Sequence, residues 1–70
     1  MEIIDTTVHR SQLRISRHEL RIMKAALNEI CNGIEVPEFD TRIGADRYEV
    51  AGLLKEVGQL LEKMKSSAPR

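Results

Sequence analysis

The sequence lacks the features that stabilise or define several classes of small protein. Its 70 residues include one cysteine, Cys31, so no disulfide can form within the chain. There is no tryptophan, and the aromatic residues are Phe39 and Tyr48, so the core must be aliphatic. The histidines, His9 and His18, form no cluster with zinc-ligand spacing. A small aliphatic core is therefore the expected internal source of stability.

The chain also lacks an excess of either charge, since eleven basic residues balance eleven acidic ones. Nucleic-acid binders normally have a basic excess because phosphate contacts dominate their affinity, so nucleic acid is not an expected partner. No apolar run approaches the ~20 residues of a membrane span, and no leader resembles a secretory signal. A lone unpaired cysteine fits a reducing compartment. We therefore expect a cytoplasmic protein that does not bind membranes.

Catalysis is not expected either. The sequence contains no nucleophile–base pair, phosphate-binding glycine loop or metal-binding cluster, and so short a chain has little room for a concave pocket. We expect no enzymatic activity, cofactor or metal. A single core in a chain of this size supplies only about 3–5 kcal/mol, so oligomerisation or a partner protein is the expected additional support.

Residues 1–15 show no helical period. Apolar and β-branched residues at Ile4, Thr6 and Val8 alternate with polar ones, which predicts extended structure. One strand, or a loose hairpin turning through the polar residues 9–12, would both fit.

A capping box predicts the start of the first helix. Ser16 is a good N-cap, and Glu19 stands three residues later, where its side chain can return to the N-cap backbone. The helix is predicted within residues 16–33, with Gly33 as a left-handed residue after its end. Its apolar stripe contains Leu20, Met23, Leu27 and Ile30.

The connector, residues 34–45, alternates apolar or β-branched residues with charged ones. Pro37 opposes a regular helix through this stretch, so we expect an extended segment packed across the helices. Arg42 is expected to reach back to Glu29 or Asn28 at the end of the first helix.

A second capping box, Asp46 with Glu49, predicts a second helix within residues 46–65, followed by a frayed tail at 66–70. Gly52 and Gly58 are costly inside a helix, so they either permit close approach of another backbone or are tolerated flaws. The apolar residues recur at heptad spacing: Val50, Leu53, Leu54, Val57, Leu60, Leu61 and Met64.

The predicted fold class is mainly α: a short N-terminal extended segment, then a two-helix antiparallel hairpin with an extended connector, completed by dimerisation. The chain forms one domain. The heptad seam either packs only on the first helix or leaves part of itself exposed for a second copy or another protein. The residues expected at that dimer or partner seam are Val50, Leu53, Val57, Leu60, Leu61 and Met64.

Acidic residues gather around the connector, at Glu29, Glu35, Glu38 and Asp40. They either form an ordinary solvated surface or present carboxylates to a basic partner such as a nuclease active site. Metal binding or acid–base chemistry by paired carboxylates has no support from histidine or from ligand spacing.

Residues 41–50 resemble the turn and recognition helix of a helix-turn-helix. That motif requires a helix directly before the glycine turn, which Pro37 and the alternating pattern oppose. The supposed recognition face also contains Asp46, Glu49 and Glu56. DNA binding is therefore kept as an alternative.

The segments Ala26-Leu27-Asn28-Glu29-Ile30-Cys31-Asn32-Gly33-Ile34 and Phe39-Asp40-Thr41-Arg42-Ile43-Gly44 resemble a group of small bacterial proteins. In that group an "ALNE[VI]CNG" helix end precedes an "FxTRxG" stretch and a second capped helix. The resemblance covers about residues 16–62. It is associated with polymorphic and contact-dependent toxin systems, where such proteins look like immunity proteins.

The resemblance implies a cytoplasmic protein that binds a cognate toxin domain and neutralises it by direct contact. On this hypothesis the acidic residues of the connector region contact the toxin. A DNA-binding or regulatory homodimer, and a small structural adaptor that folds on its partner, are the alternatives.

Overall fold

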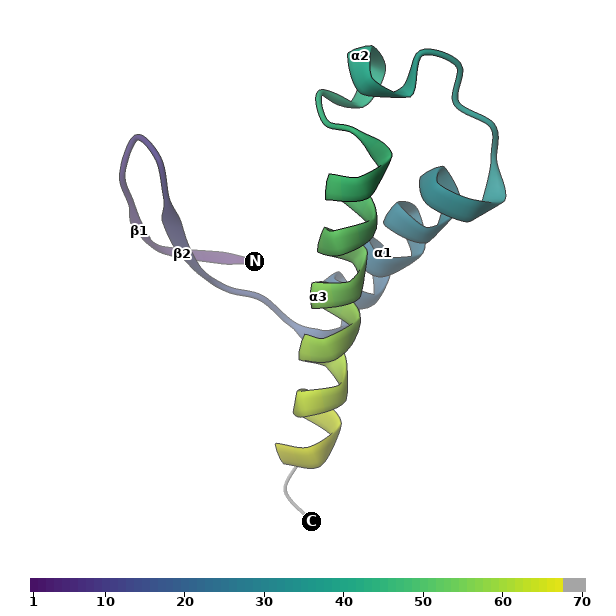
Figure 1. The fold of residues 1–70 in the computed structure, drawn as a ribbon. Helices are drawn as coiled ribbons and strands as arrows, with labels where there is room; N and C mark the ends of the chain where they lie inside the picture. The colour runs from purple at the N-terminus through teal and green to yellow at the C-terminus, as the bar shows by residue number, and fades with distance from the viewer. Residues whose placement is uncertain (68–70) are drawn as a thin grey trace.

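A computed structural model describes residues 1–67 of the chain, and it is mainly helical, at 63%. This confirms the predicted fold class at the level of composition. A β-hairpin comes first and projects to one side of the helices (Figure 1). The elements are β1 (Glu2–Thr6), β2 (Ser11–Arg14), α1 (Arg17–Asn28), a π-helical turn η1 (Glu29–Gly33), α2 (Phe39–Ile43) and α3 (Arg47–Ser67).

Both long helices begin where their capping boxes predict. The Glu19 backbone N–H donates to Ser16 Oγ at 3.1 Å, and the Ser16 N–H donates to Glu19 Oε1 at 3.0 Å. At α3 the Glu49 N–H donates to Asp46 Oδ1 at 2.8 Å, and the Asp46 N–H donates to Glu49 Oε1 at 3.3 Å. Each box satisfies backbone donors that the first helical turn leaves without a partner.

The end of the first helix differs from the prediction. Instead of stopping at a left-handed Gly33, α1 widens into η1, and the Ile34 N–H donates to the Glu29 carbonyl at 2.8 Å. Gly33 does not have a positive φ. A Cβ at this position would lie 2.5 Å from Glu29 Oε1, so the bare glycine leaves room for the Glu29 carboxylate.

The prediction of an extended connector is wrong for its second half, which forms α2. Pro37 excludes helix before itself but not after, and α2 begins two residues later, preceded by Glu38 in a left-handed conformation (φ 54°). Gly44 ends α2 at φ 83°, where its N–H donates to the Asp40 carbonyl at 2.9 Å.

Two further side-chain contacts lie near this connector. Phe39 is buried, and the Arg47 guanidinium lies over its ring, 4.6 Å from the centroid. The prediction that Arg42 reaches back to Glu29 or Asn28 is wrong, because Arg42 forms no ion pair with any described residue. Asn28, one of its expected partners, instead accepts from Asn32 Nδ2 at 3.0 Å.

Of the two forms that the sequence left open for residues 1–15, the structure has the hairpin. β1 and β2 are antiparallel, with Ile3 opposite Leu13 and an irregularity at Ile4. The Thr7 hydroxyl organises the turn by accepting from the His9 and Arg10 N–H groups at 3.3 and 3.0 Å. The turn therefore lies slightly earlier than residues 9–12.

The apolar core is small. Four hydrophobic side chains are buried among the described residues: Leu20, Phe39, Val50 and Val57. Three of them belong to α1 and α3, whose contact joins the two long helices (Figure 1). α3, at 21 residues, extends to Ser67, past the predicted end at residue 65. The rest of the predicted frayed tail, 68–70, lies outside the described residues.

The molecule is more open than its size requires. Its radius of gyration is 14.1 Å, against roughly 11 Å for a compact chain of this length. Its extents are 44 × 31 × 16 Å, because the hairpin stands away from the helices. Within residues 1–67, the helices are all too short or too polar to cross a membrane.

Two glycines of the helical region should respond oppositely to alanine. Gly44→Ala places a Cβ at a left-handed residue and should lower the free energy of unfolding by about 1–2 kcal/mol. Gly52→Ala meets no atom within 4 Å and should raise that free energy by about 0.5–1 kcal/mol through helix propensity. Urea unfolding followed by circular dichroism measures both, and a loss of stability in Gly52→Ala would contradict the open surface at that residue.

Candidate functional site

The four acidic residues predicted to contact a partner are all exposed. They follow one continuous stretch at the end of the molecule where α1 finishes and α3 begins (Figure 1). We call this stretch the acidic strip. It comprises Glu29 on η1, Glu35 and Glu38 on the connector, and Asp40 on α2.

Local structure fixes two members of the acidic strip. The Glu29 carboxylate lies over Gly33, as the position of an added Cβ shows. Glu38 takes an unusual left-handed conformation at the N-terminus of α2, which sets the direction of the chain into Asp40. No group of three or more acidic, histidine or cysteine side chains within residues 1–67 is arranged to hold a metal ion.

The heptad seam divides into two sets. Val50 and Val57 are buried, and Leu54, Leu61 and Met64 are half-buried, so these side chains belong to the chain's own packing. Leu53 and Leu60 are 49% and 43% exposed. Because they are seven residues apart, they lie on the same side of α3, two turns from each other. The part of the seam open to a partner is this pair.

The hairpin carries apolar residues that sequence reasoning did not place in a site. Ile3, Ile4 and Leu13 are 68%, 55% and 43% exposed, and Val8 at the turn is 94% exposed. A two-stranded hairpin is marginally stable in water, and each strand here has an unpaired edge. The signal available in the sequence was the alternation of apolar and polar residues within 1–15, which predicted extended structure.

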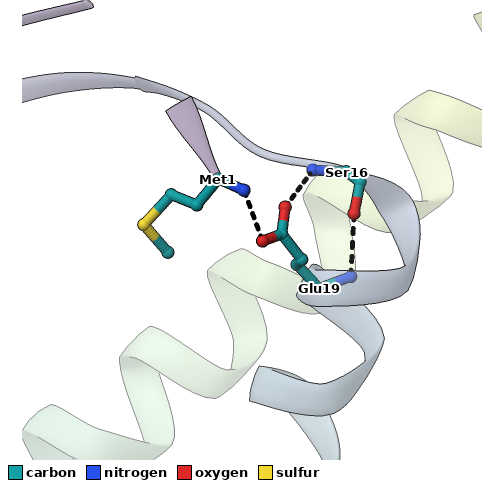
Figure 2. A network of polar contacts seen from close by, with 3 residues as sticks. All are labelled: Met1, Ser16 and Glu19. Carbon is teal, nitrogen blue, oxygen red and sulfur yellow. Dashed lines mark hydrogen bonds and ion pairs between the residues drawn. The ribbon is translucent and has the colours of Figure 1, made fainter. Parts of the chain in front are cut away.

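Glu19 joins the hairpin to the helices. Figure 2 shows its carboxylate between the backbone N–H of Ser16 and the ammonium group of Met1, which it meets at 2.5 Å. The hydrogen bond from the Met1 ammonium, with that from Ser16, lowers the pKa of Glu19 from 4.5 to about 2. The Glu19 side chain thus caps α1 and also holds Met1, the residue that precedes β1. The second ion pair of the hairpin, Arg14 with Glu2 at 2.9 Å, is exposed and contributes little.

Comparisons with known proteins return no match to a family model, to a curated protein or to a solved structure. The similarity to small immunity-type proteins therefore stays a prediction from the residue pattern.

The Glu19 junction should respond to acid. Because the folded-state pKa is lowered, its stabilising effect is complete above the unfolded value of 4.5 and is lost as pH falls toward 2. We expect the urea midpoint of the wild type to fall over this range more than that of Glu19→Gln. The glutamine retains an acceptor for the Ser16 N–H but has no charge.

Glu19→Ala is the matched comparison, because alanine removes both the charge and the acceptor for the Ser16 N–H. This variant should be the least stable of the three at neutral pH. A carboxyl pKa near 4.5 for Glu19, measured by NMR titration, would contradict this account of the junction.

Proposed function

We propose that this chain is an immunity-type binding protein that neutralises a bacterial toxin domain by direct contact. The observation that carries the proposal is the surplus surface of the isolated chain. Its accessible area is 6059 Å², against about 4,500 Å² for a compact protein of 8.0 kDa. A stable interface covers roughly 800 Å² on each partner, so the surplus is large enough for more than one.

The apolar share of this surface supports a protein partner. Only four hydrophobic side chains are buried among the described residues, while the hairpin and α3 leave several large ones in water. A partner that covers them contributes the apolar burial that the chain lacks by itself. No catalytic residue is needed for this activity, and the single cysteine suits the proposed cytoplasmic location.

The acidic strip supports a partner with a basic surface. Four exposed carboxylates at one end of a molecule of zero net charge form a local negative surface. Such a surface attracts a basic cleft, such as a nuclease active site, and can block it without being cleaved there, because carboxylates offer no phosphodiester bond. The resemblance of residues 16–62 to immunity-type proteins is the second support for a toxin as the basic partner.

We also propose that a second copy completes the core through α3. Leu53 and Leu60 form the apolar edge that remains after α3 packs on α1 in an antiparallel helical hairpin. A twofold dimer would place this edge against itself, as isologous interfaces do. The dimer then presents two acidic strips at its surface.

DNA binding by a homodimer remains the second candidate because α2 ends directly at the Gly44 turn, and this removes one objection to a helix-turn-helix. The other objection stands, since Asp46 caps the start of α3 and Glu49 lies in its first turn. Steeply salt-dependent DNA binding by the purified chain would favour this candidate over toxin neutralisation.

The toxin proposal is tested by co-purification with the product of the adjacent secreted-toxin gene. Glu35→Gln/Glu38→Gln should weaken capture roughly tenfold, because each exchange removes a charge facing the basic partner. The matched control, Glu35→Asp/Glu38→Asp, keeps both charges at the same exposed positions and should bind like the wild type. Equal capture by both variants would refute the acidic-strip interface, and no capture by the wild type would refute the toxin proposal.

The dimer proposal is tested by analytical ultracentrifugation. Leu53→Gln/Leu60→Gln should convert a dimer into a monomer with unchanged helicity, since both side chains are exposed within one chain. The control Lys55→Gln/Gln59→Ala alters exposed polar positions of the same helix and should remain dimeric. A wild-type chain that sediments as a monomer would refute the dimer.

A further inference from the structure

The polar side of α1 and the C-terminal half of α3 enclose a half-open groove of about 500 Å³. Its lining includes four cations: Arg17, Arg21 and Lys24 from α1, and Lys65 from α3. Asn28 adds a side-chain donor at one end, Glu62 is the single carboxylate, and Leu61 gives an apolar floor. We call this cavity the basic groove. A concave pocket was not expected in so short a chain.

The cations of the basic groove are not neutralised by ion pairs within the part of the chain that the structure describes. Arg17 and Arg21 are four residues apart on α1, a spacing at which like charges repel. Arg17 is also in the first turn of the helix, where the macrodipole disfavours positive charge. A bound anion would offset both of these unfavourable effects.

The two helices hold these cations in a fixed relation. Lys24 extends toward α3, where its Cε lies 3.8 Å from the position of a Cβ added at Gly58. Because Gly58 has no side chain, the alkyl part of Lys24 can lie close to α3 while its ammonium group faces the groove. Arg17, Arg21 and Lys24 occupy successive turns and span about 10 Å along α1.

We propose that the basic groove binds a small phosphate-bearing molecule through its phosphate groups. Arginine presents a planar set of donors that matches phosphate oxygens in pairs, and two arginines here face one cavity. The volume lies within the range of about 300–1,000 Å³ typical of small-ligand sites. No aromatic side chain lines the groove, so recognition depends on the phosphates and not on stacking of a base.

This site is separate from the proposed toxin interface. The acidic strip runs from η1 through the connector to α2, whereas the basic groove lies between the side of α1 that contains Arg17, Arg21 and Lys24 and the C-terminal half of α3, and it approaches the strip at Asn28, next to Glu29. The proposal therefore goes beyond toxin binding, and either one can fail without the other.

Isothermal titration of the full chain with inorganic triphosphate, at low and at physiological ionic strength, tests the proposal. We expect saturable binding of one triphosphate per chain, with amide NMR shifts concentrated at residues 17–28 and 58–65. Arg21→Gln/Lys24→Gln should weaken binding roughly tenfold, because two charge-assisted contacts are lost. Circular dichroism should show retained helicity, since the exchange relieves repulsion on α1.

The matched control is Arg42→Gln/Lys63→Gln, which removes the same charge from exposed residues outside the groove and should bind triphosphate like the wild type. Equal weakening of triphosphate binding in both variants would show that the effect comes from net charge alone, and it would overturn the site. Absence of wild-type binding would overturn it as well. Tighter binding of a single-stranded oligonucleotide or of a glutamate-rich peptide than of triphosphate would overturn the assignment to a small ligand.

Discussion

The strip of aliphatic contact between α1 and α3 is the constraint on which the rest of the structure depends. Leu20 from α1, with Val50 and Val57 from α3, accounts for most of the buried apolar side chains among residues 1–67. The capping boxes fix where the helices start, Glu19 holds the hairpin, and Phe39 under Arg47 holds the corner between α2 and α3.

The sequence predicted the local features of this fold well. Helix starts follow from side-chain hydrogen bonds between residues three apart, so Ser16 and Asp46 identified them directly. Helix ends and short helices depend on subtler balances. The π turn after Asn28 uses bonds to a carbonyl five residues back, and α2 is only five residues long, below the length at which periodicity is informative.

The candidate sites were also predictable only in part, because some of their features are local in the sequence and others depend on tertiary structure. Exposure of the acidic strip follows from charge alone. The split of the heptad seam into packed and exposed residues depends on exact spacing. Residues 50, 54, 57, 61 and 64 recur at alternating steps of four and three, which keeps them on one side of α3. Leu53 and Leu60 each lie one residue before a member of this set and so fall on its edge. The basic groove needed tertiary structure, since the register between α1 and α3 brings Lys65 beside Arg17 and no local pattern specifies that register.

The two open edges of the hairpin have a consequence for the abundance of the free chain. Unpaired N–H and C=O groups along a strand are a template for another strand, and the apolar residues beside them strengthen such pairing. Self-association of this kind rises steeply with concentration, and chain that aggregates is lost from the folded pool. The open edges of the hairpin therefore set an upper limit on the concentration at which the free chain stays unaggregated.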